Sequence, residues 1–279
     1  MSPMHKVSIL MGIYNCQEQL PAAIESILSQ SFPNIELVMC DDGSKDDTYE
    51  VARRYQEKYR DKIVLLKNEH NQGLNITLNR CLKASTGDLI ARQDADDRSL
   101  PERLETEVNY LDENPQCAFV STGMIINNGE RIVGCHMPQK HRPDKTDLIK
   151  RPQFYHAPMM IRREAILAVG GYTEDPRLLR VEDFNLWTKL YAKGYYGENI
   201  FQGLYEVCED NNTYRRRNFR TFRNGAYAKL IAVDMLHLPF YYKFYAVIHI
   251  CKGLLPNFIY RYLHRKSHSS MTAEPAQKI

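Results

Sequence analysis

The sequence lacks paired cysteines. Its seven cysteines are odd in number, are scattered along the chain and include no CxxC pair. Most lie inside apolar runs, where a free cysteine behaves as a small hydrophobic residue. This pattern argues against a disulfide framework and a zinc site, and it indicates a reducing compartment. The N-terminus has no signal-peptide core and no small-residue cleavage site, so we expect a cytoplasmic protein.

Glycine-rich phosphate loops are also missing. No GxGxxG follows the first apolar run, and GxxxxGK[ST] occurs nowhere. These absences argue against a Rossmann dinucleotide site and a P-loop. The lack of a glycine-rich loop near the first strand also disfavours a sugar nucleotidyltransferase.

Long uninterrupted hydrophobic runs are absent as well. Leu238–Leu263 is rich in aromatic and aliphatic residues, but Lys243, Lys252 and Pro256 interrupt it. A membrane span needs roughly 18 or more apolar residues in succession. The segment therefore predicts an amphipathic helix at a membrane surface, basic on one side. A helix packed on the domain, or a dimer contact, is the alternative.

Negative charge is scarce in the last quarter of the chain. From Asn211 onward, twelve Lys and Arg residues face only Asp234 and Glu274, a net charge of +10 in a chain whose total is +3. A basic tail on an acidic body predicts an anionic partner: membrane lipid, a phosphorylated ligand or nucleic acid. We expect peripheral contact with the inner face of the cell membrane and no nucleic acid.

Strands and helices alternate in the first part of the chain, as apolar runs of strand length separated by helical periodicity. This rhythm predicts an α/β fold whose central sheet is mostly parallel and flanked by helices. The expected strands are Val7–Met11, Ile35–Cys40, Ile63–Leu66 and Asp88–Ala91, and the expected helices are Leu20–Gln30, Asp46–Tyr59 and Leu74–Ala84.

The rhythm changes after Asp97. A helix is expected over Pro101–Glu113, with Ser99 as its N-cap, and Pro138–Pro152 is expected to be a mobile loop. We expect three parts, 1–100, 101–215 and 216–279, the last being a basic amphipathic helical extension. The remaining expected elements are a hairpin of Ala118–Ile126 and Arg131–His136, a strand over Phe154–Ile161, and helices over Glu164–Val169 and Glu182–Lys193.

Polar residues follow three of the predicted strands: Gly12–Asn15, Asp41–Ser44 and the run ARQDADD at Ala91–Asp97. In open parallel sheets such strand ends meet in one crevice, where ligands bind. The carboxylates of ARQDADD repel one another unless a cation lies between them, and oxygen-rich sites suit Mg²⁺ or Mn²⁺. From the motif alone, a solvated acidic turn is an equally good interpretation.

The chain resembles family 2 glycosyltransferases, which have a GT-A fold. The resemblance rests on SILMGIYNCQEQLPAAIESILSQSFPNIELVMCDDGSKDDT and NQGLNITLNRCLKASTGDLIARQDADD, which are similar to the nucleotide-sugar-binding half of that family. The later VEDFNLW is similar to the family's ED-x-x-x-W segment. The match runs from about Val7 to Trp187, and it is most similar to bacterial exopolysaccharide and capsule enzymes.

The resemblance implies a donor site and a metal site. Tyr14 would stack on the nucleotide base, Asp42 would accept a hydrogen bond from uracil, and Asp41 would serve the backbone turn. Gly12 is expected in the same site. Arg92 either contacts the nucleotide or pairs with its acidic neighbours. The expected ligands of an Mn²⁺ or Mg²⁺ ion bridging the donor phosphates are Asp94 and Asp96 of the DXD motif, with Asp97 as a third.

Asp183 matches the family's catalytic base, which deprotonates the acceptor hydroxyl. Glu182 is its helper or interacts with the helix dipole. Trp187 either walls the acceptor site or packs in the core. His156 is a core histidine or a ligand contact. One of Arg215, Arg216 and Arg217 could fold over the diphosphate.

Together these residues predict an inverting, metal-dependent glycosyltransferase of exopolysaccharide or capsule biosynthesis. It would move a sugar from a nucleoside diphosphate sugar, with a UDP-sugar expected, to a saccharide or lipid-linked saccharide acceptor. A second hypothesis stays open. The chain could be a regulatory binding protein on a glycosyltransferase scaffold, such as a flagellar motor brake.

Overall fold

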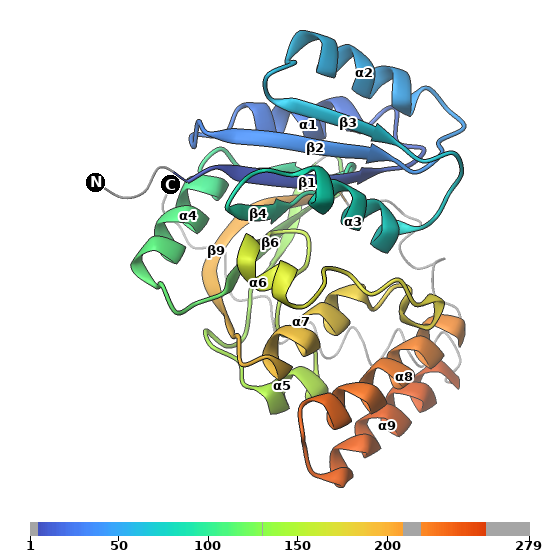
Figure 1. The fold of residues 1–279 in the computed structure, drawn as a ribbon. Helices are drawn as coiled ribbons and strands as arrows, with labels where there is room; N and C mark the ends of the chain where they lie inside the picture. The colour runs from blue at the N-terminus through green and yellow to red at the C-terminus, as the bar shows by residue number, and fades with distance from the viewer. Residues whose placement is uncertain (1–4, 130, 209–218, 255–279) are drawn as a thin grey trace.

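The computed structural model describes residues 5–129, 131–208 and 219–254 (Figure 1). One nine-stranded sheet runs through both halves of the chain in the order β3-β2-β1-β4-β8-β6-β9-β5, and β7 pairs with β6 outside this path. Helices cover the sheet on both faces, and a pair of helices lies at the end away from β3.

The first half is a parallel α/β unit, as the sequence predicts. β1 pairs with β2 on one side and with β4 on the other, and β2 pairs with β3, all in parallel. The chain therefore changes direction across the sheet at β1. The elements are β1 (Val7–Ile13), α1 (Leu20–Leu28), β2 (Ile35–Asp41), α2 (Thr48–Lys58), β3 (Ile63–Lys67), α3 (Leu74–Ala84) and β4 (Leu89–Arg92).

The second half adds antiparallel pairs, so the sheet as a whole is mixed. β8 lies antiparallel between β4 and β6, and β5 lies antiparallel to β9, whereas β6 and β9 run parallel. The elements are β5 (Arg98–Ser99), α4 (Arg103–Glu113), β6 (Phe119–Asn127), β7 (Ile132–His136), α5 (Lys145–Lys150), β8 (Met159–Arg162), α6 (Arg163–Ala168), η1 (Pro176–Leu178), α7 (Glu182–Ala192) and β9 (Gly197–Cys208).

Two local predictions are wrong. Ser99 is not an N-cap: it lies in β5, its hydroxyl donates to Gln93 Oε1 at 2.6 Å, and α4 begins only at Arg103. The expected loop Pro138–Pro152 contains α5. A capping box starts this helix, because the Asp144 carboxylate accepts from the amides of Thr146 and Asp147.

Alternating side chains of β1 fill two cores, one on each face of the sheet. Ile9 and Met11 belong to the core beneath α1 and α4. Leu10, between them, belongs to the core beneath α3, α6 and α7. Because both faces are covered, β1 and β2 are apolar almost throughout, as parallel central strands usually are.

The C-terminal part of the described chain is a helical hairpin (Figure 1). It consists of α8 (Phe219–Met235), the short turn η3 (Phe240–Lys243) and α9 (Phe244–Leu254). The segment predicted as one helix from Leu238 begins as η3 at Phe240 and continues directly as α9, and its part beyond Leu254 lies outside the described residues. No helix of residues 5–129, 131–208 and 219–254 is long and apolar enough to cross a bilayer.

Candidate functional site

The loops after β1 and β2 are joined at the carboxyl edge of the sheet. The amide of Asn15 donates to the Ser44 hydroxyl at 3.0 Å, and the amide of Lys45 donates to Asn15 Oδ1 at 2.9 Å. Asn15 adopts a left-handed backbone conformation, with φ of 47°, which asparagine tolerates better than most residues. The neighbouring Tyr14 is left 43% exposed at this edge, where a base could stack on its ring.

Asp42 is buried and holds the loop that precedes α3. Its carboxylate accepts from the side-chain amide of Asn68 at 2.7 Å and from the backbone amides of Gln72 and Gly73 at 2.8 and 2.9 Å. Asp41 accepts a longer bond from the Ser44 amide, so both carboxylates serve the backbone here. A carboxylate offers about four acceptor positions, which leaves room for the predicted contact of Asp42 with uracil.

Arg92 pairs with Asp94, one of the two outcomes left open by the sequence. The guanidinium is buried and makes two hydrogen bonds to the half-exposed carboxylate, while its Nε, also buried, has no protein partner. Burial lowers the pKa of Arg92, but the charge of Asp94 more than compensates and holds it above its usual value. Arg92 is therefore a fixed positive charge under the DXD loop.

A buried network that the sequence did not reveal holds the same loop from below. The side-chain amide of Gln93 donates to the carbonyl oxygens of Asp94 and Asp97, both at 3.0 Å, and so ties the two ends of the turn together. Arg103, fully buried, donates to Gln93 Oε1 at 3.2 Å and to the Arg92 carbonyl at 2.8 Å. Its charge is balanced by the equally buried Glu107 at 3.3 Å.

Residues in the second half of the chain also form hydrogen bonds to the DXD loop. The Asp94 amide donates to the hydroxyl of Tyr205, on β9, at 2.9 Å, and the Cys208 amide donates to Asp97 Oδ1 at 3.0 Å. The Arg103–Glu107 spacing of four residues on the buried side of α4 is a sequence signal that could have indicated the ion pair. No such signal marks Tyr205, because its place depends on the pairing of β9 with β5 and β6.

The three aspartates of the loop differ in environment. Asp96 is exposed, and Asp94 forms an ion pair with Arg92. Asp97 is buried, and burial, followed by the charges of Asp94 and Asp96, raises its pKa to about 8. Within the described ranges, no three His, Cys, Asp or Glu side chains lie together as a ready cation cage.

This donor set still fits a hard dication that arrives with its nucleotide. Mg²⁺ and Mn²⁺ at such sites take one or two carboxylates and complete their shell with water and substrate phosphates. Asp94, Asp96 and Asp97 supply carboxylate oxygen on a loop that Gln93 closes. Their assignment as metal ligands stays a prediction.

Asp183 lies in the first turn of α7, beside Glu182. Burial raises the pKa of Asp183, while the Phe184 amide and the charge of Arg92 oppose the increase. Burial, followed by the charge of Asp183, also raises the pKa of Glu182, and the charges of Arg92 and Asp94 act on it as well. The charge of Arg92 therefore acts on both the predicted base and the predicted donor loop. A carboxylate with a raised pKa has the property that a general base requires.

The surroundings of His156 and Trp187 indicate that both residues pack in the core. His156 Nε2 lies 2.9 Å from the Tyr172 hydroxyl, and burial together with the charge of Arg92 lowers its pKa well below the usual value. Trp187 is buried and stacks on Phe119 at 4.5 Å between ring centroids, which favours core packing over an acceptor wall. Gly12 is tightly enclosed, since a side chain there would meet Leu74 and Thr77 on α3 at 3.2 Å.

Arg215, Arg216 and Arg217 lie outside the described residues.

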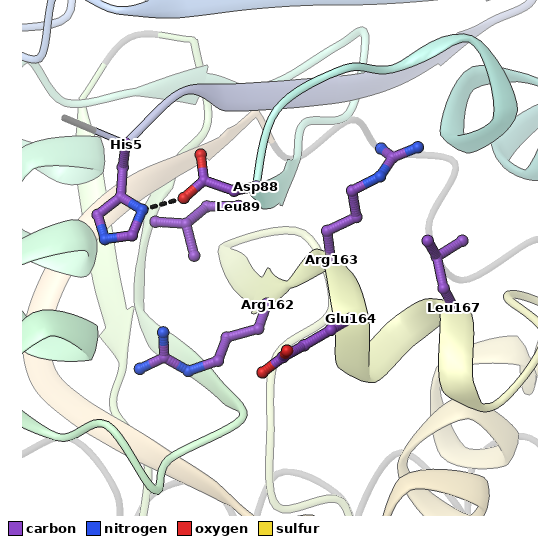
Figure 2. Close-up of a pocket in the computed structure, with 7 residues that line it drawn as sticks. All are labelled: His5, Asp88, Leu89, Arg162, Arg163, Glu164 and Leu167. Carbon is purple, nitrogen blue, oxygen red and sulfur yellow. Dashed lines mark hydrogen bonds and ion pairs between the residues drawn. The ribbon is translucent and has the colours of Figure 1, made fainter. Parts of the chain in front are cut away.

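Figure 2 shows a surface pocket formed by His5, Asp88, Leu89, Arg162, Arg163, Glu164 and Leu167. It lies at the amino end of β4, the opposite end of that strand from the DXD loop. Its polar groups serve the fold: His5 bridges Asp88 and Asp112, and Arg162 donates to the Leu111 carbonyl at the end of α4.

Comparison with known proteins agrees with this geometry. The family model of glycosyl transferase family 2 matches residues 8–170. EpsE of Bacillus subtilis (strain 168), which is named as a glycosyltransferase, is 37% identical over 261 residues and covers 94% of each chain. WfaP of Escherichia coli is named as a UDP-Glc:alpha-D-GlcNAc-diphosphoundecaprenol beta-1,3-glucosyltransferase. It is 33% identical over 196 residues, covering 70% of this chain and 74% of its own.

Two solved structures share the fold. The mannosyltransferase PcManGT of Pyrobaculum calidifontis, in complex with GDP-Man and Mn²⁺, has a TM-score of 0.64 at 19% identity over 95% of this chain and 80% of its own. TarS 1-349 of S. aureus, in complex with UDP-GlcNAc, has the same TM-score and identity over 83% and 70%. The fold is thus that of GT-A glycosyltransferases. The chain belongs to glycosyl transferase family 2 and is a glycosyltransferase.

Proposed function

We propose that the protein is an inverting, metal-dependent enzyme that transfers a sugar from a UDP-sugar to a lipid-linked saccharide during exopolysaccharide or capsule synthesis. The observation that carries the proposal is that one buried guanidinium, Arg92, acts on both parts of the candidate site. Arg92 pairs with Asp94 of the DXD loop, and its charge also acts on the buried Asp183, whose pKa is raised.

The donor is held by the strand-end loops in this proposal. Tyr14 stacks on the base, Asp42 accepts from the base edge, and the rigid loop of Asp94, Asp96 and Asp97 presents oxygen to the metal and the diphosphate. The metal, when bound, neutralises the charge of the departing nucleoside diphosphate. Gln93 and Arg103 fix the loop, so that little reorganisation is needed when the donor arrives.

Asp183 acts on the acceptor. Its carboxylate takes the proton of the acceptor hydroxyl as that oxygen attacks the anomeric carbon from the face opposite the diphosphate, which inverts the configuration. The charge of Arg92 opposes the increase in the pKa of Asp183 that burial causes. Glu182, whose pKa is also raised, shares the first turn of α7.

The nature of donor and acceptor is supported by the relatives. WfaP is named for transfer from UDP-Glc to a diphosphoundecaprenol-linked sugar, and AmsE of Erwinia amylovora is named for amylovoran biosynthesis. For this chain we expect similar chemistry at the inner face of a membrane. The regulatory hypothesis, a glycosyltransferase scaffold that acts as a motor brake, receives no support from these names.

A panel of nucleotide sugars tests the proposal. The full chain is incubated with each UDP-sugar, with GDP-mannose as the contrasting base, in the presence of Mn²⁺, Mg²⁺ or EDTA. We expect UDP release with one or a few UDP-sugars, loss of release in EDTA, and an inverted anomeric configuration in the product by NMR. Equal turnover in EDTA, or retention of configuration, would contradict it.

A further inference from the structure

The outward side of the helical hairpin carries a continuous apolar surface. Phe240, Tyr241 and Phe244 are 80, 67 and 64% exposed, and Val247, Ile248 and Leu254 are 51, 38 and 68% exposed. The first two belong to η3 and the other four to α9, and we call these six residues the outer face of α9. Val247 and Ile248 follow Phe244 by three and four positions, and Leu254 follows Val247 by seven, so the residues of α9 share one side of the helix. Single exposed hydrophobic residues are ordinary, but a contiguous group of this size marks an interaction site.

The opposite side of α9 is already used. Ala246 is buried against the hairpin, His249 packs beside Gly225 of α8, and Gly253 packs against Phe222. Burial, followed by the charges of Lys229 and Lys252, lowers the pKa of His249 to about 4, so the ring is neutral at this contact. The helix is thus apolar on two sides, and only one of them is covered by the described chain.

The charges around the outer face identify its partner. Residues 240–254 contain no Asp or Glu and two lysines, Lys243 and Lys252. Lys243 turns inward to Asp234 at 2.7 Å, so the outer face is chiefly aromatic and aliphatic, with Lys252 exposed at its far end. The sequence that follows, residues 255–279, carries four Lys and Arg against one Glu.

This combination suits an anionic lipid surface better than a second copy of the chain. Phe and Tyr side chains favour the boundary between lipid headgroups and acyl chains, and basic residues add attraction to anionic headgroups. A two-fold dimer through the same face would bring the positive chains together.

The hairpin also contacts the segment that leads into α7. The side-chain amide of Asn224, on α8, donates to the Leu179 carbonyl at 3.1 Å, and the Arg177 guanidinium lies 4.6 Å from the ring centre of Tyr227. Leu179 lies just before α7, whose first turn contains Asp183. Figure 1 shows α8 between α7 and α9. A surface bound by α9 would therefore hold the predicted base at a set distance from it.

We propose that the outer face of α9 inserts into the interface of an anionic membrane and so presents the active site to an acceptor in that membrane. The second clause rests on the proposed function, whereas the lipid contact does not. The sequence predicted an amphipathic helix at a membrane surface, basic on one side, and the proposal now names the apolar residues that would make the contact.

Vesicle flotation with the full chain tests the contact. The vesicles contain phosphatidylethanolamine and phosphatidylglycerol, or phosphatidylcholine alone, and carry no saccharide lipid, so acceptor recognition plays no part. We expect binding to the anionic vesicles and much weaker binding to phosphatidylcholine. Replacing Phe240 and Phe244 with serine should lower the bound fraction at anionic vesicles by at least about tenfold. The matched control replaces Ile132 and Leu167, which are exposed apolar residues elsewhere, and should bind like the wild type.

Because both phenylalanines are exposed, the variant should keep the melting temperature and the UDP-sugar hydrolysis of the wild type, which confirms that it is folded. Equal flotation of variant and wild type would overturn the proposal. So would absence of binding to both vesicles, or a dimer in light scattering that the variant abolishes. If flotation fails while UDP release persists, only this inference is lost; if UDP release fails while flotation holds, only the proposed function is lost.

Discussion

The strand-end loops and the start of α7 hold their carboxylates in opposite ways. Asp42 accepts three hydrogen bonds from residues 26 to 31 positions further along the chain. Asp183 is held by the amides of its own helix turn, and burial raises its pKa. Several donors hold the Asp42 carboxylate in one position, whereas burial with few donors raises the pKa of Asp183. The contrast agrees with the proposed roles of Asp42 in binding and of Asp183 in the reaction.

The largest effect is expected from Asp183→Asn. The amide cannot accept the acceptor proton, so the transfer rate should fall by about 10²- to 10⁴-fold. UDP affinity, measured by calorimetry with Mn²⁺, should stay unchanged because the strand-end loops are intact. Glu182→Gln is the neighbouring control and should cost much less. Weakened UDP binding in Asp183→Asn would contradict the assignment of binding to the strand-end loops and of proton transfer to Asp183.

Asp96→Ala should have the reverse pattern. Losing one carboxylate ligand weakens neutralisation of the diphosphate, so Mn²⁺-dependent UDP affinity should fall by about 100-fold. Without metal, the variant and the wild type should bind UDP equally weakly. The measurement is a calorimetric titration in Mn²⁺ and in EDTA. If Asp96→Ala instead binds UDP normally, Asp96 does not ligate the metal in the manner proposed.

Arg103→Met tests how the loop gains its rigidity. Removing the arginine leaves Glu107 buried without its partner, and breaking a buried ion pair costs about 3–5 kcal/mol. The free energy of unfolding in urea should fall by that amount. Arg103→Met combined with Glu107→Leu should recover most of the loss, because no buried charge remains. If the double variant is as unstable as the single one, the ion pair does not account for the effect.

The smallest effect is a shift on the pH axis. Asp183 must be ionised to accept a proton, and burial raises its pKa above the usual value of about 3.9. The transfer rate at saturating donor and Mn²⁺ should therefore rise with pH until this raised pKa is passed and then level off. Below it, the rate should drop about tenfold per pH unit. The acidic limb should vanish in the residual activity of Asp183→Asn; its persistence there would assign it to another group.

The first half of the chain could be predicted from the sequence more accurately than the second half. The strands and helices of the first half were predicted to within a few residues, because each is a local apolar run or period bounded by turn residues. α3 was predicted with its observed bounds. In the second half, the twelve-residue β9 and the helix α5 were not predicted. Only half of the β9 residues are buried, and the strand finds its place only by pairing with β6 and β5.

The sequence by itself determined the family, the strand-end location of Asp42 and Asp94–Asp97, and the candidate base Asp183, because short motifs follow local strand and helix boundaries. The tertiary structure alone decided that Arg92 pairs with Asp94, that Gln93 and Tyr205 close the loop, and that α9 turns its apolar side outward. The reason is physical. A hydrogen bond or ion pair between residues more than a hundred positions apart, such as Tyr205 and Asp94, depends on how the strands pair, and no local pattern records that pairing.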